Sequence, residues 1–180
     1  MVPTLAATLG VKGHRPTVGT RDCKDLLYVF CVVNLISAAI TSNTLDSPAR
    51  AKQKTGKSKT RRMQEAFAHH LRHVGQVYPQ HKYQEVVILI DNAPWHRGQP
   101  IDAALSANPH LKFKRLPSYS PQLNPIERFW KKLRRRATHN RLFDTMTDLK
   151  QSIRASVCYF QTVRQKVKSM LEPRKKTPAK

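Results

Sequence analysis

A short run of β-branched and aliphatic residues that ends in an aspartate is the feature that most constrains the fold of this chain. Residues 86–90 read Val-Val-Ile-Leu-Ile and are followed by Asp91. An unbroken apolar run of this length favours a strand buried on both faces, as in the parallel sheets of α/β proteins. Asn92, Pro94 and Gly98 then break the strand into a loop. Because open α/β sheets bind ligands at the carboxyl ends of their strands, Asp91 is predicted to face a crevice. The alternative is an ordinary turn residue at a strand end.

A second acidic residue, Glu127, lies near the start of a predicted helix. Asn124 suits the N-cap of this helix and Pro125 its first position. Apolar residues then follow at helical spacing: Ile126, Phe129, Trp130 and Leu133. The simplest interpretation is that Glu127 completes a capping box with Asn124 and pairs with Lys131 one turn later. The other is that the helix presents Glu127 to the crevice that Asp91 faces.

Three further strands are predicted from composition. Residues 26–33 and 35–44 read as two adjacent strands, which we expect to be antiparallel, although the turn between them is poorly marked. Residues 111–116 alternate apolar with basic side chains and read as a strand next to 86–90. With the helices, the predicted order is strand, strand, basic loop, helix, strand, helix, strand, helix, helix. This order indicates an α/β protein.

Two more segments have the apolar spacing of helices. Residues 63–77 predict one helix, and residues 146–170 predict one long helix or two with a break near Cys158. On the first of these, His69 and His73 have the i, i+4 spacing of a metal-binding pair. Because the sequence between them lacks the glutamate of a zincin motif and no third ligand is evident, we interpret them as part of a polar helix face.

The charge of the chain restricts its partners. Its 180 residues include 33 Lys and Arg against 11 Asp and Glu, a formal net charge of +22. This excess favours a polyanion, with nucleic acid ahead of an anionic membrane surface. We expect no membrane insertion, because the longest apolar run, residues 26–40, is interrupted by polar residues and is shorter than the roughly 20 residues that a spanning helix needs. Three cysteines without metal-type spacing and no evident signal peptide favour a cytoplasmic protein.

Positive charge is concentrated in residues 46–62, which contain almost no apolar side chains. We predict an irregular basic loop here, and two interpretations remain open. It either contacts DNA phosphates and becomes ordered on binding, or it is a solvated connection. The basic residues that would contact phosphate are Arg50, Lys52, Lys54, Lys57, Lys59, Arg61 and Arg62.

Two sequence stretches carry a specific resemblance. DNAPWH at 91–96, followed by LPSYSPQLNPIERFW at 116–130, resembles the catalytic domain of the Asp-Asp-Glu (DDE) transposases, in the bacterial insertion-sequence branch of the mariner superfamily. The spacing of Asp91 and Glu127 is close to that between the second and third acidic residues of this family. The resemblance implies a ribonuclease H-like mixed sheet flanked by helices over residues 1–171. Residues 172–180 are basic and contain proline, and we expect a disordered tail there.

The same resemblance implies metal-dependent DNA strand cleavage and strand transfer at insertion-sequence ends. It assigns Asp91 and Glu127 as catalytic, metal-binding residues. Two Mg²⁺ or Mn²⁺ ions, about 3.5 to 4 Å apart, would neutralise charge at the attacking and leaving oxygens, and carboxylates are the ligands that such hard cations prefer. Asn92, His96 and Asn124 are expected to orient the site, although His96 has the alternative of an ordinary loop histidine. Basic residues of the helix that carries Glu127 are expected to contact DNA, namely Lys131, Arg134 and Arg135.

The resemblance also implies a feature that we do not find in the sequence. The first aspartate of the family lies on a strand that precedes the GHRP-like segment, here residues 13–16, and neither Asp22, Asp25 nor Asp46 has a matching context. We therefore expect a transposase fragment that lacks its central first strand and is weak or inactive alone. One alternative is a non-catalytic, basic DNA-binding protein, and another is a different ribonuclease H-like nuclease. The C-terminal helical segment is expected to pack on the sheet or to form a homodimer seam.

Overall fold

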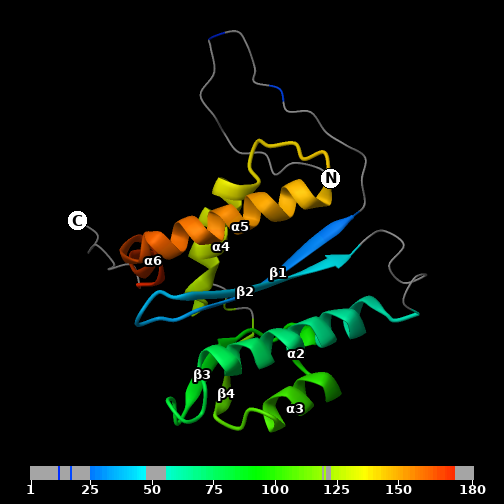
Figure 1. The fold of residues 1–180 in the computed structure, drawn as a ribbon, viewed down its shortest axis with the longest axis vertical. Helices are drawn as coiled ribbons and strands as arrows, with labels where there is room; N and C mark the ends of the chain where they lie inside the picture. The colour runs from blue at the N-terminus through cyan, green and yellow to red at the C-terminus, as the bar shows by residue number, and fades with distance from the viewer. Residues whose placement is uncertain are drawn as a thin grey trace. The chain divides into compact units, whose positions relative to one another are not determined.

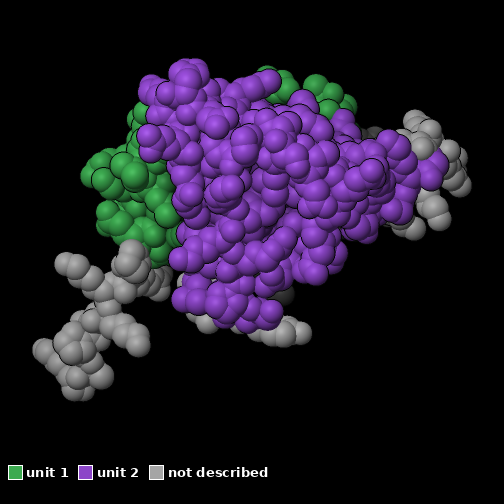
Figure 2. Space-filling view, turned by 90° about the horizontal axis from the view of Figure 1, so that it is seen from below, with its two compact units in different colours: residues 1–22, 33–40, 125–180 green, residues 23–32, 41–124 purple. Residues whose placement is uncertain are grey.

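The computed structural model describes residues 25–47, 56–118, 120 and 123–172, with the isolated residues 12 and 17. The chain divides into two compact units, which Figure 2 colours separately. Unit 1 contains residues 1–22, 33–40 and 125–180, and unit 2 contains residues 23–32 and 41–124. Of the predicted phosphate contacts, Arg50, Lys52 and Lys54 lie outside the described residues, as do the GHRP segment at 13–16 and residues 173–180 of the tail.

The first two strands, β1 (Leu26–Val33) and β2 (Ile40–Ser47), form a two-stranded sheet and run in opposite directions (Figure 1). The predicted start of the second strand at Leu35 is wrong, because a turn occupies the residues before Ile40. In this turn the side chain of Asn34 accepts hydrogen bonds from the backbone N–H groups of Ile36 and Ser37, each at 2.9 Å. Ala38 has φ of 55° in the left-handed region. The asparagine side chain thus stabilises a turn that glycine would ordinarily mark.

Helix α2 (Lys59–Val77) begins earlier than the predicted residue 63. Ser58 is its N-cap, and the Ser58 hydroxyl accepts a hydrogen bond from the Arg61 backbone N–H at 3.1 Å. The predicted basic loop over 46–62 is therefore wrong at both ends, since β2 extends to Ser47 and α2 takes in the last basic residues. The predicted apolar stripe is confirmed, with four buried side chains: Met63, Phe67, Leu71 and Val74.

Strands β3 (Val86–Ile90) and β4 (Leu111–Arg115) are parallel and in register from Val86 opposite Leu111 to Ile90 opposite Arg115. The 3-10 helix η1 (Pro94–His96) and helix α3 (Gln99–Ser106) connect them, as the sequence pattern predicted. The prediction that β3 is buried on both faces is wrong. Ile88 and Ile90 join the core of unit 2, whereas Val87 is 51% and Leu89 36% exposed. Residues of α2 and α3 pack against the buried face only.

Close contact between α2 and α3 depends on one glycine. A methyl group added at Gly75 of α2 would overlap the side chain of Asn108, which follows α3. Asn108 is itself held in place, because its side-chain amide donates to the carbonyl oxygen of Ala104 at 2.9 Å. Gly75 therefore permits the approach that buries Ala104 and Ile101, which are 0% and 1% exposed.

The described helices of unit 1 are α4 (Ile126–Ala137), α5 (Met146–Thr162) and α6 (Arg164–Leu171), and they pack on one another. Their buried side chains include Phe129, Leu133, Leu149, Ile153, Val157, Phe160, Val167 and Leu171. The two-helix alternative for the C-terminal segment is confirmed, but the break lies at Val163, where φ is −105° and ψ 49°, rather than near Cys158. The Arg128 guanidinium donates to the Leu171 carbonyl oxygen at 2.9 Å and ties α4 to the end of α6.

The described strands therefore hydrogen-bond as two separate pairs, β1 with β2 and β3 with β4. Their order along the chain, with the intervening helices, is the α/β order that the sequence predicted. Among the described residues, no helix is long and apolar enough to cross a membrane.

Candidate functional site

Asp91 lies where the parallel strands of unit 2 end. It follows directly after Ile90, the last residue of β3, and its side chain is 55% exposed. The ends of the two strands are joined beyond the regular pairing. The Leu116 N–H donates to the Ile90 carbonyl oxygen at 2.8 Å, and the side-chain amide of Asn92 donates to the Leu116 carbonyl oxygen at 2.8 Å. The backbone of Leu116 thus holds the chain on both sides of Asp91, at Ile90 and at Asn92.

The side chain of His96 contacts the Asp91 carboxylate. Its Nδ1 is 2.8 Å from Asp91 Oδ1, and the same oxygen accepts a hydrogen bond from the Ala93 N–H at 3.1 Å. Burial lowers the pKa of His96 below its ordinary value, although the Asp91 carboxylate acts in the opposite direction. The ring is therefore neutral at neutral pH, with the proton on Nδ1 assigned from this hydrogen bond, and its Nε2 retains a lone pair.

Packing also fixes the position of the His96 ring. Its centroid lies 4.5 Å from that of Phe67 in α2, and its carbonyl oxygen accepts a hydrogen bond from the Arg115 guanidinium at 3.0 Å. The neighbouring Trp95 packs against the core of unit 2. The structure thus brings Asp91, Asn92 and His96 together on one loop.

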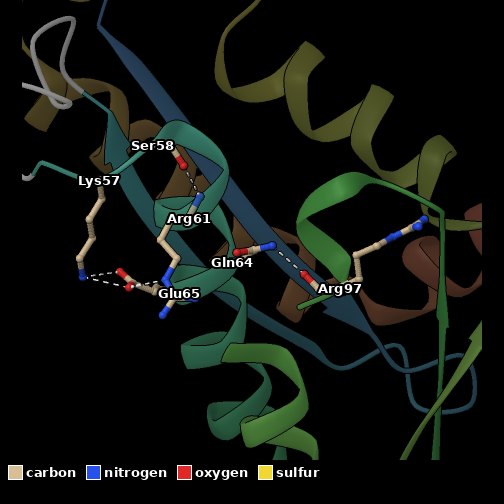
Figure 3. A network of polar contacts seen from close by, with 6 residues as sticks. All are labelled: Lys57, Ser58, Arg61, Gln64, Glu65 and Arg97. Atoms are coloured by element: carbon tan, nitrogen blue, oxygen red, sulfur yellow. Dashed lines mark hydrogen bonds and ion pairs between the residues drawn. The ribbon is translucent and has the colours of Figure 1, made fainter. Parts of the chain in front are cut away.

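Helix α2 holds this loop through a residue that the sequence analysis missed. The side-chain amide of Gln64 donates to the Arg97 carbonyl oxygen at 2.7 Å (Figure 3). The next residue, Gly98, has φ of 110°, and a Cβ there would lie only 2.9 Å from Gln64 Nε2. A glycine is thus required beside the hydrogen bond. The sequence marked Gly98 as a strand breaker, but nothing in it pointed to Gln64.

The basic residues at the start of α2 already have partners. Lys57 and Arg61 both contact the Glu65 carboxylate, at 2.9 and 3.2 Å (Figure 3). The Lys59 ammonium lies 5.4 Å from the ring centroid of Tyr28, and Arg62 donates to the Ser47 hydroxyl at 3.1 Å. Ion pairs as exposed as those of Glu65 are weak and screened by salt, so Lys57 and Arg61 remain available to a phosphate.

Glu127 belongs to the other unit and has fewer fixed contacts. It is exposed in the first turn of α4. The predicted N-cap at Asn124 is wrong, because the structure places the cap at Pro125, where no side-chain hydrogen bond closes the helix end. The expected pair with Lys131 is also absent from the ion pairs of the described residues. Without a cap or an ion pair, the carboxylate is available to a ligand. The DNA contacts predicted on the same helix, Lys131, Arg134 and Arg135, are exposed.

The two histidines of α2 that converge are not the two that the sequence suggested. Nδ1 of His70 and Nδ1 of His73 lie 2.6 and 2.9 Å from the side-chain oxygen of Asn43 in β2, whereas His69 is exposed. Burial, followed by the charges of His73 and His69, lowers the pKa of His70 to about 4. No group of three or more His, Cys, Asp or Glu side chains that could hold a metal ion occurs in the described part of the chain.

Two solved structures have a similar fold. One is the Mos1 transposase paired-end complex with left transposon end, with a TM-score of 0.54 and 16% identity over 94% of this chain and 51% of that chain. The other is the Mos1 mariner paired end complex with Mn, with a TM-score of 0.55 and 15% identity over 95% of this chain and 52% of that chain. This likeness confirms the ribonuclease H-like α/β fold class. The chain spans about half the length of these relatives.

The family follows from the sequence comparison. The model of the DDE superfamily endonuclease matches residues 47–150, more than half of the chain, and the protein belongs to this family. The uncharacterized protein y4pE/y4sA of Sinorhizobium fredii (strain NBRC 101917 / NGR234) is 29% identical over 85 residues, which cover 47% of this chain and 58% of that protein. The matched family segment contains both Asp91 and Glu127.

Proposed function

We propose that this chain is the catalytic-domain part of a transposase that cleaves and transfers DNA strands at insertion-sequence ends. The observation that carries the proposal is the position of Asp91 inside the matched family segment, at the carboxyl end of β3, with its carboxylate oriented by His96. Glu127 supplies the second carboxylate. The partner is double-stranded DNA, and the protein works in the cytoplasm and at the nucleoid, with a homodimer as the expected assembly.

The residues present have the right chemistry for a divalent ion. Asp91 Oδ1 is occupied by His96 and Ala93, whereas Oδ2 has no hydrogen-bond partner among the described residues. Oδ2 and the exposed Glu127 carboxylate are hard oxygen donors that suit Mg²⁺ or Mn²⁺. When bound, such ions neutralise charge at the phosphate under attack.

The other residues of the loop act by orientation and proton transfer. Asn92 keeps the strand ends together, so that Asp91 stays at the edge of the sheet. Nε2 of the neutral His96 ring can accept a proton, and the Nδ1–H bond to Asp91 fixes which nitrogen does so. Exposed basic residues of α4 bind the DNA backbone.

The test is nicking of a supercoiled plasmid by the purified chain in Mg²⁺ or Mn²⁺. We expect weak cleavage, because the sequence matches only the second and third acidic residues of the family, Asp91 and Glu127. Asp91→Asn and Glu127→Gln should each abolish it, and Asp102→Asn, an exposed aspartate of α3, should leave it unchanged. Strong cleavage that Asp91→Asn removes would contradict weak activity, and cleavage that survives both changes would contradict the assigned site.

A second candidate function is DNA binding without cleavage. The net charge of +22 favours it, since phosphate contacts alone provide affinity. In that case DNA binding would weaken steeply with salt, Asp91→Asn would not alter it, and no metal would produce nicking.

A further inference from the structure

Unit 1 contains a pocket of about 360 Å³ that the proposed active site does not use. Its lining residues come from the C-terminal end of α4, the loop that follows it and α5. Its lining includes Arg136, Arg141, Phe143, Asp148, Gln151 and Ser152. Pockets that hold small organic groups have volumes of roughly 300 to 1,000 Å³, so this one fits a group the size of one nucleotide.

Arg136 is held in place by an aromatic ring. Its guanidinium carbon lies 3.6 Å from the ring centroid of Tyr159 on α5. Stacking of this kind covers one face of the guanidinium and leaves its N–H edges free to donate. Arg136 forms no ion pair among the described residues. It is therefore a preorganised donor without a counter-charge.

Arg141 is held by a chain of hydrogen bonds. One of its terminal nitrogens donates to the Ser152 hydroxyl at 3.4 Å, and that hydroxyl donates to the Ala137 carbonyl oxygen at 2.8 Å. Only one of the five N–H donors of the guanidinium is used in this way. Like Arg136, it has no carboxylate partner in the described part of the chain. Two guanidinium groups that line one pocket can bind a phosphate through paired N–H hydrogen bonds.

The charge of the pocket distinguishes between kinds of phosphate. Asp148 also lines it, but Asp148 Oδ2 accepts hydrogen bonds from the backbone N–H and the hydroxyl of Thr145, at 3.0 and 2.7 Å. With both arginines counted, the pocket carries one net positive charge. A phosphodiester carries one negative charge, whereas a terminal phosphate carries about −1.5 to −2. The pocket is thus matched to a phosphate within a strand.

Phe143 provides an apolar surface in the same pocket, beside the side-chain amide of Gln151. Aromatic side chains bind nucleobases by stacking, which tolerates any base because each has a π face. In a duplex both faces of a base are already stacked on its neighbours. Only an unpaired nucleotide can therefore bring its base to Phe143 while its phosphate reaches the arginines.

We propose that this pocket holds one unpaired nucleotide of a DNA strand, with its phosphodiester on Arg136 and Arg141 and its base on Phe143. The inference rests on the proposed function, because it takes DNA as the ligand. It adds to that function a site that selects single-stranded over duplex DNA.

The test is fluorescence anisotropy of the full chain with two labelled probes, a short blunt duplex and the same duplex with a single-stranded overhang. We expect the overhang probe to bind about fivefold tighter or more, in line with the stacking of one base. Arg141→Gln and Phe143→Leu should each remove this preference. Arg141→Lys should reduce it, because lysine keeps the charge but loses the paired donors.

The matched control is Arg154→Gln, since Arg154 is exposed on α5 and does not line the pocket. This variant should weaken binding of both probes equally and leave the ratio of their affinities unchanged. Excess dAMP or inorganic phosphate should not displace the overhang, because neither contains a phosphodiester. Equal affinity for the two probes, pocket variants that match Arg154→Gln, or displacement by dAMP would each overturn the inference while leaving DNA binding intact. Failure to bind either probe would instead overturn the DNA-binding part of the proposed function as well.

Discussion

The two regions that carry the family motif are supported in different ways. The loop around Asp91 is held by several specific contacts. Asn92 donates a hydrogen bond to Leu116, and His96 contacts the Asp91 carboxylate. The side chain of Gln64 donates to the Arg97 carbonyl oxygen. The first turn of α4 presents Glu127 with neither a side-chain cap nor an ion pair to a described residue. The position of Asp91 therefore depends on specific hydrogen bonds, whereas that of Glu127 depends on how α4 packs within unit 1.

The largest effect should come from the packing of α4. Phe129 is 0% exposed and its ring lies 5.4 Å from that of Phe160. Phe129→Ala should destabilise unit 1 by about 3 to 5 kcal/mol, through lost burial and a cavity. The two tryptophans allow a selective measurement, because Trp130 lies in unit 1 and Trp95 in unit 2. In the Trp95→Phe background, where fluorescence reports on Trp130, the midpoint of urea unfolding should move to a lower urea concentration. If the unfolding midpoint moved equally in the Trp130→Phe background, where fluorescence reports on Trp95, the Asp91 loop and the first turn of α4 would not be stabilised independently.

A pH effect should be the next in size and should affect unit 2. The pKa of buried His70 is lowered to about 4 from the ordinary 6.5, so below pH 6.5 the unfolded chain binds a proton that the folded chain does not. Stability is complete above pH 6.5 and falls as the pH approaches 4, by up to about 3 kcal/mol. Urea unfolding of the Trp130→Phe protein should show this loss between pH 7 and 4.

The control for the pH effect compares two neighbouring histidines of α2. His70→Gln should flatten the pH dependence, and His69→Gln should retain it, because His69 is exposed. If His69→Gln flattened the profile to the same extent, the burial of His70 would not be its source.

Loss of the hydrogen bond between Gln64 and the Asp91 loop should have a smaller effect. Gln64→Ala removes one 2.7 Å hydrogen bond to Arg97, with a cost of about 1 kcal/mol. Hydrogen exchange measured by mass spectrometry should become faster in residues 91–98 and stay unchanged in α4. Gln76→Ala, at an exposed position of the same helix, is the matched control. Unchanged hydrogen exchange in the loop would show that the remaining contacts, those of Asn92 and His96, are enough to hold it in place.

The smallest effect should come from the exposed cluster at the start of α2. Its two cations hold the pKa of the Glu65 carboxyl below its ordinary value, first through the Lys57 hydrogen bond. Glu65→Gln should release Lys57 and Arg61, so that DNA binding strengthens slightly and its salt dependence steepens by about one phosphate contact. The measurement is a salt titration of duplex binding, with Glu85→Gln as an exposed control of equal charge. Weaker binding by Glu65→Gln would mean that this cluster does not face DNA.

Local patterns were sufficient to predict much of the fold and part of the site. The stripe of α2 was found because its apolar residues repeat with the period of a helix, and β3 because a short unbroken run of β-branched and aliphatic residues is typical of a strand. Asn92 and His96 were picked out by their place in the motif, and both lie beside Asp91. The turn at Asn34 and the break at Val163 were missed, since neither is marked by glycine or proline. Gln64 was missed because its partner, Arg97, lies far along the chain.

The sequence by itself determined the class of this protein, its family motif and the order of its strands and helices, since these depend on neighbours in the chain and on their spacing. Only the tertiary structure decided which face of β3 is covered, that His70 rather than His69 joins His73 at Asn43, and that the arginines beside Phe143 surround a pocket. The physical reason is the same in each case. Burial and hydrogen bonding between distant residues depend on how helices pack, and a linear pattern does not contain that information.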